Sequence, residues 1–300
     1  MEQLNQTDEA ELDRVLSSLE PIDIVTAERL LKEIKQVMDR AAVPFFLRQG
    51  TCLGVIRDNA LIPWDDDIDV GSVFGLHVFN EETVLSVART LRERGFILKV
   101  GRNDHYLWVA MVKESVRIDW NCYWVIDDAV FMYPGVRIPV HLLTDLKEID
   151  FLGEKFLVPN PPEDYLEAKY GPEWHVPKPA GAYEEDILSL VPDAPVPSRF
   201  GRLGQFFTRY LQWRHATRVQ VLDQQGRPVS GARISVAGIG IYRANRQGVV
   251  RLYLPRVDYY ALVVTFDNHR GVLYVEKINP DQSYLYQQNE KHLLAIDGIG

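Results

Sequence analysis

The chain has 300 residues and a formal net charge of −9, with 46% hydrophobic and 25% charged residues. This composition is typical of a folded protein of about two domains and excludes disorder as the default state. The negative charge disfavours nucleic acid as a partner, because the average field repels polyanions. The two cysteines, Cys52 and Cys122, lack CxxC spacing, which excludes a disulfide framework and a thiolate zinc site.

The first 21 residues form an acidic segment without the basic start and apolar core of a secretory signal. No segment approaches the roughly 18 uninterrupted apolar residues that a membrane span needs. The sequence therefore predicts a cytoplasmic protein. It contains no feature that sets an oligomeric state.

The next part of the chain predicts a strand–turn–helix unit. Residues 24–38 carry apolar side chains at helical spacing and predict an amphipathic helix. The aromatic run at 45–47 predicts a short strand, and Gly50-Thr51 predicts a tight turn before a short helix over 52–57. After Pro63, residues 68–70 predict an extended segment, because proline interrupts a helix.

Further elements complete a mixed α/β domain over residues 22–198. Helical periodicity returns over 81–94, and three segments rich in aromatic and β-branched residues predict strands over 96–100, 106–112 and 116–125. A proline-rich passage over 159–197 is predicted to wrap this domain and to end in a linker.

The composition changes after this passage. Residues 199–216 combine arginines with aromatic residues and have two interpretations: peripheral contact with an anionic inner membrane face, or packing between two domains. From 217 to 287, short alternating runs separated by glycine-containing turns predict a small all-β sandwich, and 288–300 form a C-terminal tail.

Four aspartates lie within five residues of an otherwise apolar segment, WDDDID at 64–69. Side chains alternate along a strand, so Asp65, Asp67 and Asp69 are predicted to share one face. Neighbouring carboxylates repel one another, and a bound divalent cation removes that repulsion. Mg²⁺ or Mn²⁺ suits such hard oxygen ligands, so we expect one of these ions as the cofactor.

Two other interpretations of this segment are weaker. A calcium-binding EF-hand loop needs glycine at its sixth position and glutamate at its twelfth, where this chain has Val70 and Leu76. A solvated acidic turn would usually lack the apolar neighbours Ile62 and Ile68.

The segment Gly50–Gly71, GTCLGVIRDNALIPWDDDIDVG, resembles the signature of the LicD and fukutin-related family of the nucleotidyltransferase superfamily. The likeness extends over about residues 22–180. It implies a nucleotidyltransferase fold with a mixed sheet and a third carboxylate on a later strand, for which Asp119 fits. Residues 217–286 similarly resemble a carboxypeptidase regulatory-like, or transthyretin-like, sandwich, which implies acceptor recognition, assembly or a purely structural role.

The resemblance implies roles for individual residues. Asp67, Asp69 and Asp119 are the expected catalytic residues, and with Asp65 they form the expected metal site, in which Asp119 is either a ligand or a proton acceptor. Five residues are candidates for substrate binding: Gly50, Thr51, Arg57, Tyr170 and Trp174. The alternatives are pairing of Arg57 with Asp65 or Asp66, and core packing of the two aromatic side chains.

The family resemblance implies transfer of a phospho-alcohol, namely phosphocholine, ribitol phosphate or glycerol phosphate. The donor would be a CDP-activated alcohol and the acceptor a hydroxyl of a cell-surface glycan. The residues alone predict only metal-assisted phosphoryl or nucleotidyl chemistry. Two alternatives stay open: nucleotidyl transfer to a small molecule or protein, and a non-catalytic module that binds glycan or protein.

Overall fold

The computed structural model describes residues 6–16, 18, 20–76, 79–179, 182–191, 194–197 and 216–297. The chain forms two compact units, Met1–Phe131 with Arg137–Ala180, and Met132–Val136 with Gly181–Gly300. The basic aromatic stretch predicted over 199–216 lies outside the described residues except for its last residue. None of the described helices is long and apolar enough to cross a membrane.

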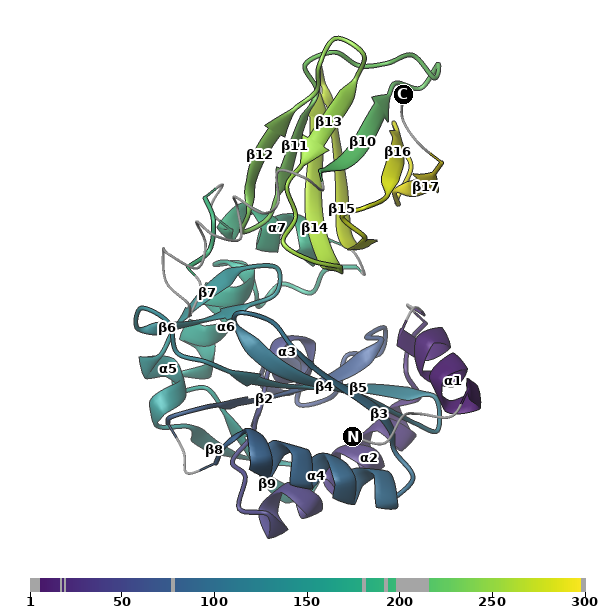
Figure 1. The fold of residues 1–300 in the computed structure, drawn as a ribbon. Coiled ribbons are helices and arrows are strands. Elements are labelled where there is room, and N and C mark those ends of the chain that lie inside the picture. Colours follow the sequence, from purple (N-terminus) through teal and green to yellow (C-terminus); the bar gives the residue numbers. More distant parts are fainter. Residues whose placement is uncertain are drawn as a thin grey trace. The chain divides into compact units, whose positions relative to one another are not determined.

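The first unit is built around a mixed sheet (Figure 1), whose five strands have the order β1-β2-β5-β4-β3. β2 and β5 run parallel, and the other neighbouring pairs are antiparallel. The strands of this sheet are β1 Phe46–Leu47, β2 Asp67–Val73, β3 Ile97–Arg102, β4 Tyr106–Lys113 and β5 Val116–Tyr123. The predicted mixed α/β fold class is confirmed for this unit.

Helices cover the sheet, and α2 and α4 lie side by side against one of its faces (Figure 1). The apolar stripe of α2 is fully buried, including Leu30, Leu31 and Ile34, as its helical spacing predicts. The helices of this unit are α1 Gln6–Leu16, α2 Ile24–Arg40, α3 Gln49–Asp58, α4 Glu81–Glu93, α5 His141–Thr144 and α6 Pro162–Tyr170.

Side-chain caps define where the two longer helices begin. Asp23 accepts a hydrogen bond from the backbone N–H of Thr26, which satisfies one free donor of the first turn of α2. Asn80 and Thr83 form a capping box at α4. Residues 6–16 of the acidic N-terminal segment form α1, whose Leu12 and Val15 pack against Val112.

Two short hairpins complete the strands in this part of the chain: β6 Ala129–Met132 with β7 Val136–Pro139, and β8 Lys147–Phe151 with β9 Glu154–Val158. The passage predicted to wrap the domain contains helix α6 and then helix α7, Tyr183–Leu190, and α7 belongs to the second unit.

The second unit contains two four-stranded sheets, in the orders β13-β10-β16-β17 and β12-β11-β14-β15. Side chains from both sheets share one buried core, which includes Val219, Val250, Ile234 and Leu262. This is the two-layer packing that alternating strands allow. The strands are β10 Thr217–Leu222, β11 Arg233–Val236, β12 Gly240–Arg243, β13 Val249–Leu252, β14 Asp258–Phe266, β15 His269–Ile278, β16 Ser283–Gln287 and β17 Leu294–Ile296. Its likeness to carboxypeptidase regulatory-like domains stays a prediction.

Candidate active site

Three carboxylates meet at the centre of the sheet of the first unit. Asp67 and Asp69 are two residues apart on β2, so their side chains leave the same face. Asp119 lies on the neighbouring parallel strand β5, directly in register with Asp69. Ligand oxygens of the three residues all lie within 4.8 Å of one another. The structure therefore brings together the three residues that we call the aspartate trio.

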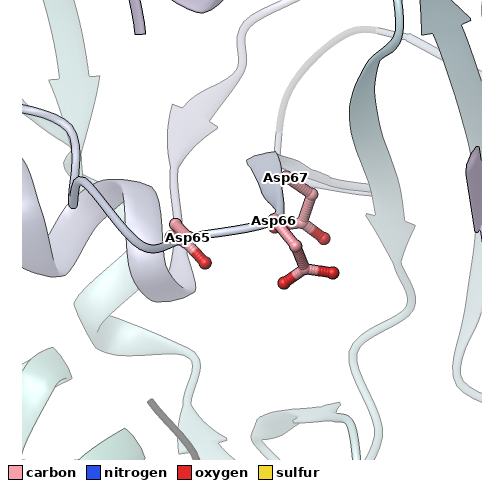
Figure 2. Close-up of side chains that lie close together, drawn as sticks. All are labelled: Asp65, Asp66 and Asp67. Carbon is pink, nitrogen blue, oxygen red and sulfur yellow. The ribbon is translucent and has the colours of Figure 1, made fainter. Parts of the chain in front are cut away.

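Asp65 belongs to a second acidic group, with Asp66 and Asp67, on the segment that enters β2 (Figure 2). The alternation argument does not extend to Asp65, because β2 begins only at Asp67. The Asp65 carboxylate instead lies against the backbone of Gly50, where an added Cβ would overlap with its Oδ2 atom. Glycine at position 50 therefore leaves room for this carboxylate at the start of α3.

A buried arginine that the sequence analysis did not identify neutralises part of the trio. Arg48 is 1% exposed and directly precedes α3. Its Nη2 lies 2.5 Å from Oδ1 of Asp69, and its Nε donates to the carbonyl oxygen of Val70 at 3.0 Å. Burial is the largest single effect and opposes the charged guanidinium, but Asp69, Tyr123, Asp119 and Tyr165 together outweigh it and raise the pKa of Arg48.

A second arginine, Arg117, lies among the carboxylates. It is in register with Asp67 and two residues before Asp119, so it shares their face of the sheet. Its Nη2 donates to Oδ2 of Asp119 at 2.6 Å, its Nε lies 3.7 Å from Oδ2 of Asp67, and its Nη1 lies 3.7 Å from Oδ2 of Asp66. The two-residue spacing from Asp119 was the signal that could have identified it.

Hydrogen bonds hold the start of α3 against β2 and α6. Thr51, a candidate for substrate binding, is 1% exposed, and its Oγ1 accepts the backbone N–H of Asp69 at 2.8 Å. The backbone N–H of Gln49 donates to the Tyr165 hydroxyl at 2.9 Å, and its side-chain amide donates to Asp69 at 3.3 Å. These bonds set the position of Asp69 relative to the helix N-terminus.

The other candidates for substrate binding lie in different environments. Arg57 binds Asp58 through Nη2 at 2.6 Å; no ion pair with Asp65 or Asp66 is found for it among the described residues. Tyr170 is buried at the end of α6, as core packing would require. Trp174 is half-buried and meets His175 edge-to-face.

Burial and the repulsion between neighbouring carboxylates raise the pKa values of several acidic groups in the site. Burial, together with Asp69 and Asp66, raises the pKa of Asp65 to about 8. Burial first, then the charge of Asp69, raises the pKa of Asp67 well above its usual range. The fully buried Lys169 on α6 has a pKa lowered to about 7, chiefly by burial and then by Arg48. The sequence analysis found no signal for this lysine.

The chemistry of the trio fits a hard divalent cation. Three carboxylates converge on one point, and Oδ1 of Asp119 is buried with no hydrogen-bond partner among the described residues. An unsatisfied buried carboxylate oxygen is costly unless a proton donor or a cation approaches it. Mg²⁺ and Mn²⁺ prefer such oxygen ligands.

Residues 42–161, which contain the trio, match the family model "LicD/FKTN/FKRP, nucleotidyltransferase domain". The segment Gly50–Gly71 lies within this match. The mouse ribitol-5-phosphate transferase FKTN is 27% identical over 165 residues, which cover 50% of this chain and 33% of that protein. The human ribitol 5-phosphate transferase FKRP is 29% identical over 145 residues, which cover 45% of this chain and 29% of that protein. The chain thus spans about a third of the length of these relatives.

Among solved structures, the solution structure of the antibiotic-resistance factor ANT(2'')-Ia covers 64% of this chain and 97% of its own. It has 16% sequence identity and a TM-score of 0.38.

Proposed function

We propose that this protein is a metal-dependent phosphotransferase that moves a phospho-alcohol from a CDP-activated donor to a hydroxyl of a cell-surface glycan. The observation that carries the proposal is the aspartate trio, whose oxygens lie within 4.8 Å of one another inside the segment that matches the LicD/FKTN/FKRP domain. The names of the relatives favour ribitol phosphate as the transferred group, with glycerol phosphate and phosphocholine as the other candidates.

In this proposal, Asp67 and Asp69 hold Mg²⁺ or Mn²⁺ through their carboxylates, and Arg48 keeps the Asp69 carboxylate in place. The bound ion supplies charge neutralisation for the diphosphate of the donor. Asp119 offers Oδ1 as a third ligand or as the proton acceptor, because its Oδ2 is held by Arg117. Gly50 lies at the N-terminus of α3, where backbone N–H groups favour an anion.

The reaction exchanges one phosphorus–oxygen bond for another. The acceptor oxygen forms a bond to the phosphorus that carries the alcohol, and the bond from this phosphorus to the CMP oxygen breaks. CMP leaves with the electron pair of that bond. The hydroxyl proton is released to a carboxylate or to water.

The test is incubation of the chain with Mg²⁺ and CDP-ribitol, CDP-glycerol or CDP-choline, with and without glycan acceptors, while CMP is measured. We expect Asp67→Asn and Asp69→Asn each to abolish CMP release and to stay folded by circular dichroism. Asp150→Asn on β8 is the matched control, because this carboxylate is exposed and pairs only with Lys155 among the described residues. Wild-type turnover in either trio variant would refute the site. Release of pyrophosphate in a parallel incubation with CTP in place of the CDP-alcohol would support nucleotidyl transfer instead.

Asp119→Asn separates its two roles. If Asp119 is a metal ligand, the variant binds Mn²⁺ more weakly than the wild type does. If Asp119 accepts the proton, the variant keeps Mn²⁺ affinity and loses turnover.

A further inference from the structure

The two arginines near the trio differ in how firmly they are held. Arg48 has a 1% exposed side chain and binds both a carboxylate and backbone carbonyl groups. Arg117 has a 23% exposed side chain, and within the described part of the chain its one hydrogen bond joins Nη2 to Asp119. Arg48 is therefore a fixed part of the core, whereas Arg117 has room to change its partners.

The donors of Arg117 are far from satisfied. A guanidinium carries five N–H groups, yet the Nε of Arg117 is buried without a hydrogen-bond partner among the described residues. Its contacts with Asp66 and Asp67 are both 3.7 Å, beyond the length of a hydrogen bond. This arginine presents unused donors at the edge of the acidic site.

Arg117 shares two carboxylates of the trio with the expected metal ion. It contacts Oδ2 of Asp119 and faces Oδ2 of Asp67, and these two carboxylates belong to the group whose oxygens converge. A divalent ion bound by the same carboxylates would lie close to the guanidinium, and two neighbouring cations repel each other even where they contact different oxygens of one carboxylate. Binding of the ion must weaken the hold of these carboxylates on the guanidinium.

We propose that Arg117 is a mobile substrate-binding residue, which neutralises Asp67 and Asp119 before the divalent ion binds and then turns its freed donors to the diphosphate of the donor. This inference rests on the proposed function. Planar guanidinium groups bind phosphate oxygens in a bidentate manner, which suits this role. Asp66 is not part of the trio, so its carboxylate remains available to keep the displaced Arg117 at the edge of the site.

The proposed role of Arg117 predicts opposite changes in Mn²⁺ affinity and CDP affinity when the residue is replaced, which a purely structural role does not predict. Removal of Arg117 takes away a competitor for the carboxylates, so Mn²⁺ should bind more tightly when no nucleotide is present. The same change removes a phosphate ligand, so CDP should bind more weakly at saturating Mn²⁺. A variant that merely disturbed the fold would lose affinity for both.

The experiment compares the full-length wild type with Arg117→Met and Arg117→Lys by titration of Mn²⁺ and, at saturating Mn²⁺, of CDP. For Arg117→Met we expect Mn²⁺ affinity to rise by about fivefold or more, the lower range of coupling between competing ligands. We expect CMP release from the donor to fall by about 100-fold, as for the loss of one charge-stabilising donor. Arg117→Lys keeps the charge without the planar fork and should give intermediate CDP affinity.

Arg102→Met on β3 is the matched control, because Arg102 lies on the same sheet and makes an exposed ion pair with Glu81 at 3.4 Å. It should change neither affinity. Unchanged or weaker Mn²⁺ binding in Arg117→Met, or unchanged CDP binding, would overturn the inference about Arg117. The proposed function would still stand in that case, provided that the wild-type protein releases CMP. If the wild type itself binds no Mn²⁺ and releases no CMP, the proposed function fails first.

Discussion

At the scale of single side chains, the charged residues around β2 form two kinds of ion pair, one buried and one more exposed. Arg48 is buried with Asp69, and removal of one partner of such a pair costs about 3–5 kcal/mol, because it leaves an uncompensated buried charge. We therefore expect Asp69→Asn to stay folded with a reduced free energy of unfolding. Asp66 and Arg117 keep more contact with solvent. The first kind of pair fixes the backbone of the site, and the second kind leaves charges that a ligand can rearrange.

Gly50→Ala tests whether the position of the Asp65 carboxylate matters for the reaction. The added Cβ overlaps only with the end of the Asp65 side chain, which can rotate away. We therefore expect a loss of stability of about 1 kcal/mol or less, together with a large loss of CMP release, because Asp65 leaves its place beside the trio. Urea unfolding and the CMP assay measure the two effects.

Gly54→Ala is the matched control on the same helix. There the Cβ meets the backbone carbonyl oxygen of Ala60 at 2.5 Å and the side chain of Ile62 at 2.9 Å. Backbone cannot give way cheaply, so we expect a loss of about 1–3 kcal/mol of stability. If Gly50→Ala retained full turnover, Asp65 would have no role in the reaction.

At the scale of elements, the sequence predicted the strand and the helices of this unit, but the tight turn predicted at Gly50-Thr51 is wrong, because both residues lie within α3. The helix predicted over 24–38 extends over Ile24–Arg40, and the extended segment at 68–70 is the middle of β2. The helical spacing of the apolar residues predicts α2, because this helix buries one apolar stripe along its length. The short helix begins earlier than predicted, at Gln49 rather than Cys52, since its first turn is held by Tyr165, a residue distant in sequence.

The buried cations of the site could not be predicted in the same way. Lys169 reaches the neighbourhood of Asp69 from α6, about a hundred residues later in the chain, and no local pattern encodes that approach. Arg48 stands where a strand meets a helix, so its side chain could equally have faced solvent. Tertiary packing decides both positions.

His269 at the β14–β15 turn gives the second unit a predictable response to pH. Its Nε2 lies 2.7 Å from the Tyr286 hydroxyl, its ring packs on Phe266, and burial lowers its pKa from the ordinary value near 6.5. The unfolded chain then binds the proton more readily than the folded chain. The contribution of this residue to stability is therefore present above about pH 6.5 and lost as the pH falls through the lowered pKa.

An NMR titration of the His269 imidazole in the full-length chain measures this directly. We expect a midpoint below that of an unstructured histidine peptide, and a His269→Gln variant whose stability changes less between pH 7 and pH 5. A midpoint at or above the peptide value would contradict the assigned environment.

At the scale of the whole molecule, the two units have separate cores, and the candidate site lies in the first of them. The trio and its arginines all come from β2, β5 and the start of α3, whereas the core of the second unit draws on strands of its two sheets. A ligand that binds only the trio therefore stabilises the first unit by mass action, and the free energy of unfolding of the second unit does not contain this contribution.

Calorimetry of the full-length chain with and without Mn²⁺ tests this separation. We expect one unfolding transition to move to higher temperature with Mn²⁺, by an amount that reflects about 2.7 kcal/mol at a hundred times the dissociation constant, while the other transition stays in place. Asp67→Asn should remove the shift, since it removes a carboxylate of the trio, and Asp150→Asn should retain it. An equal shift of all transitions would contradict the separate unfolding of the two units, and a shift that survives in Asp67→Asn would show that Mn²⁺ binds outside the trio.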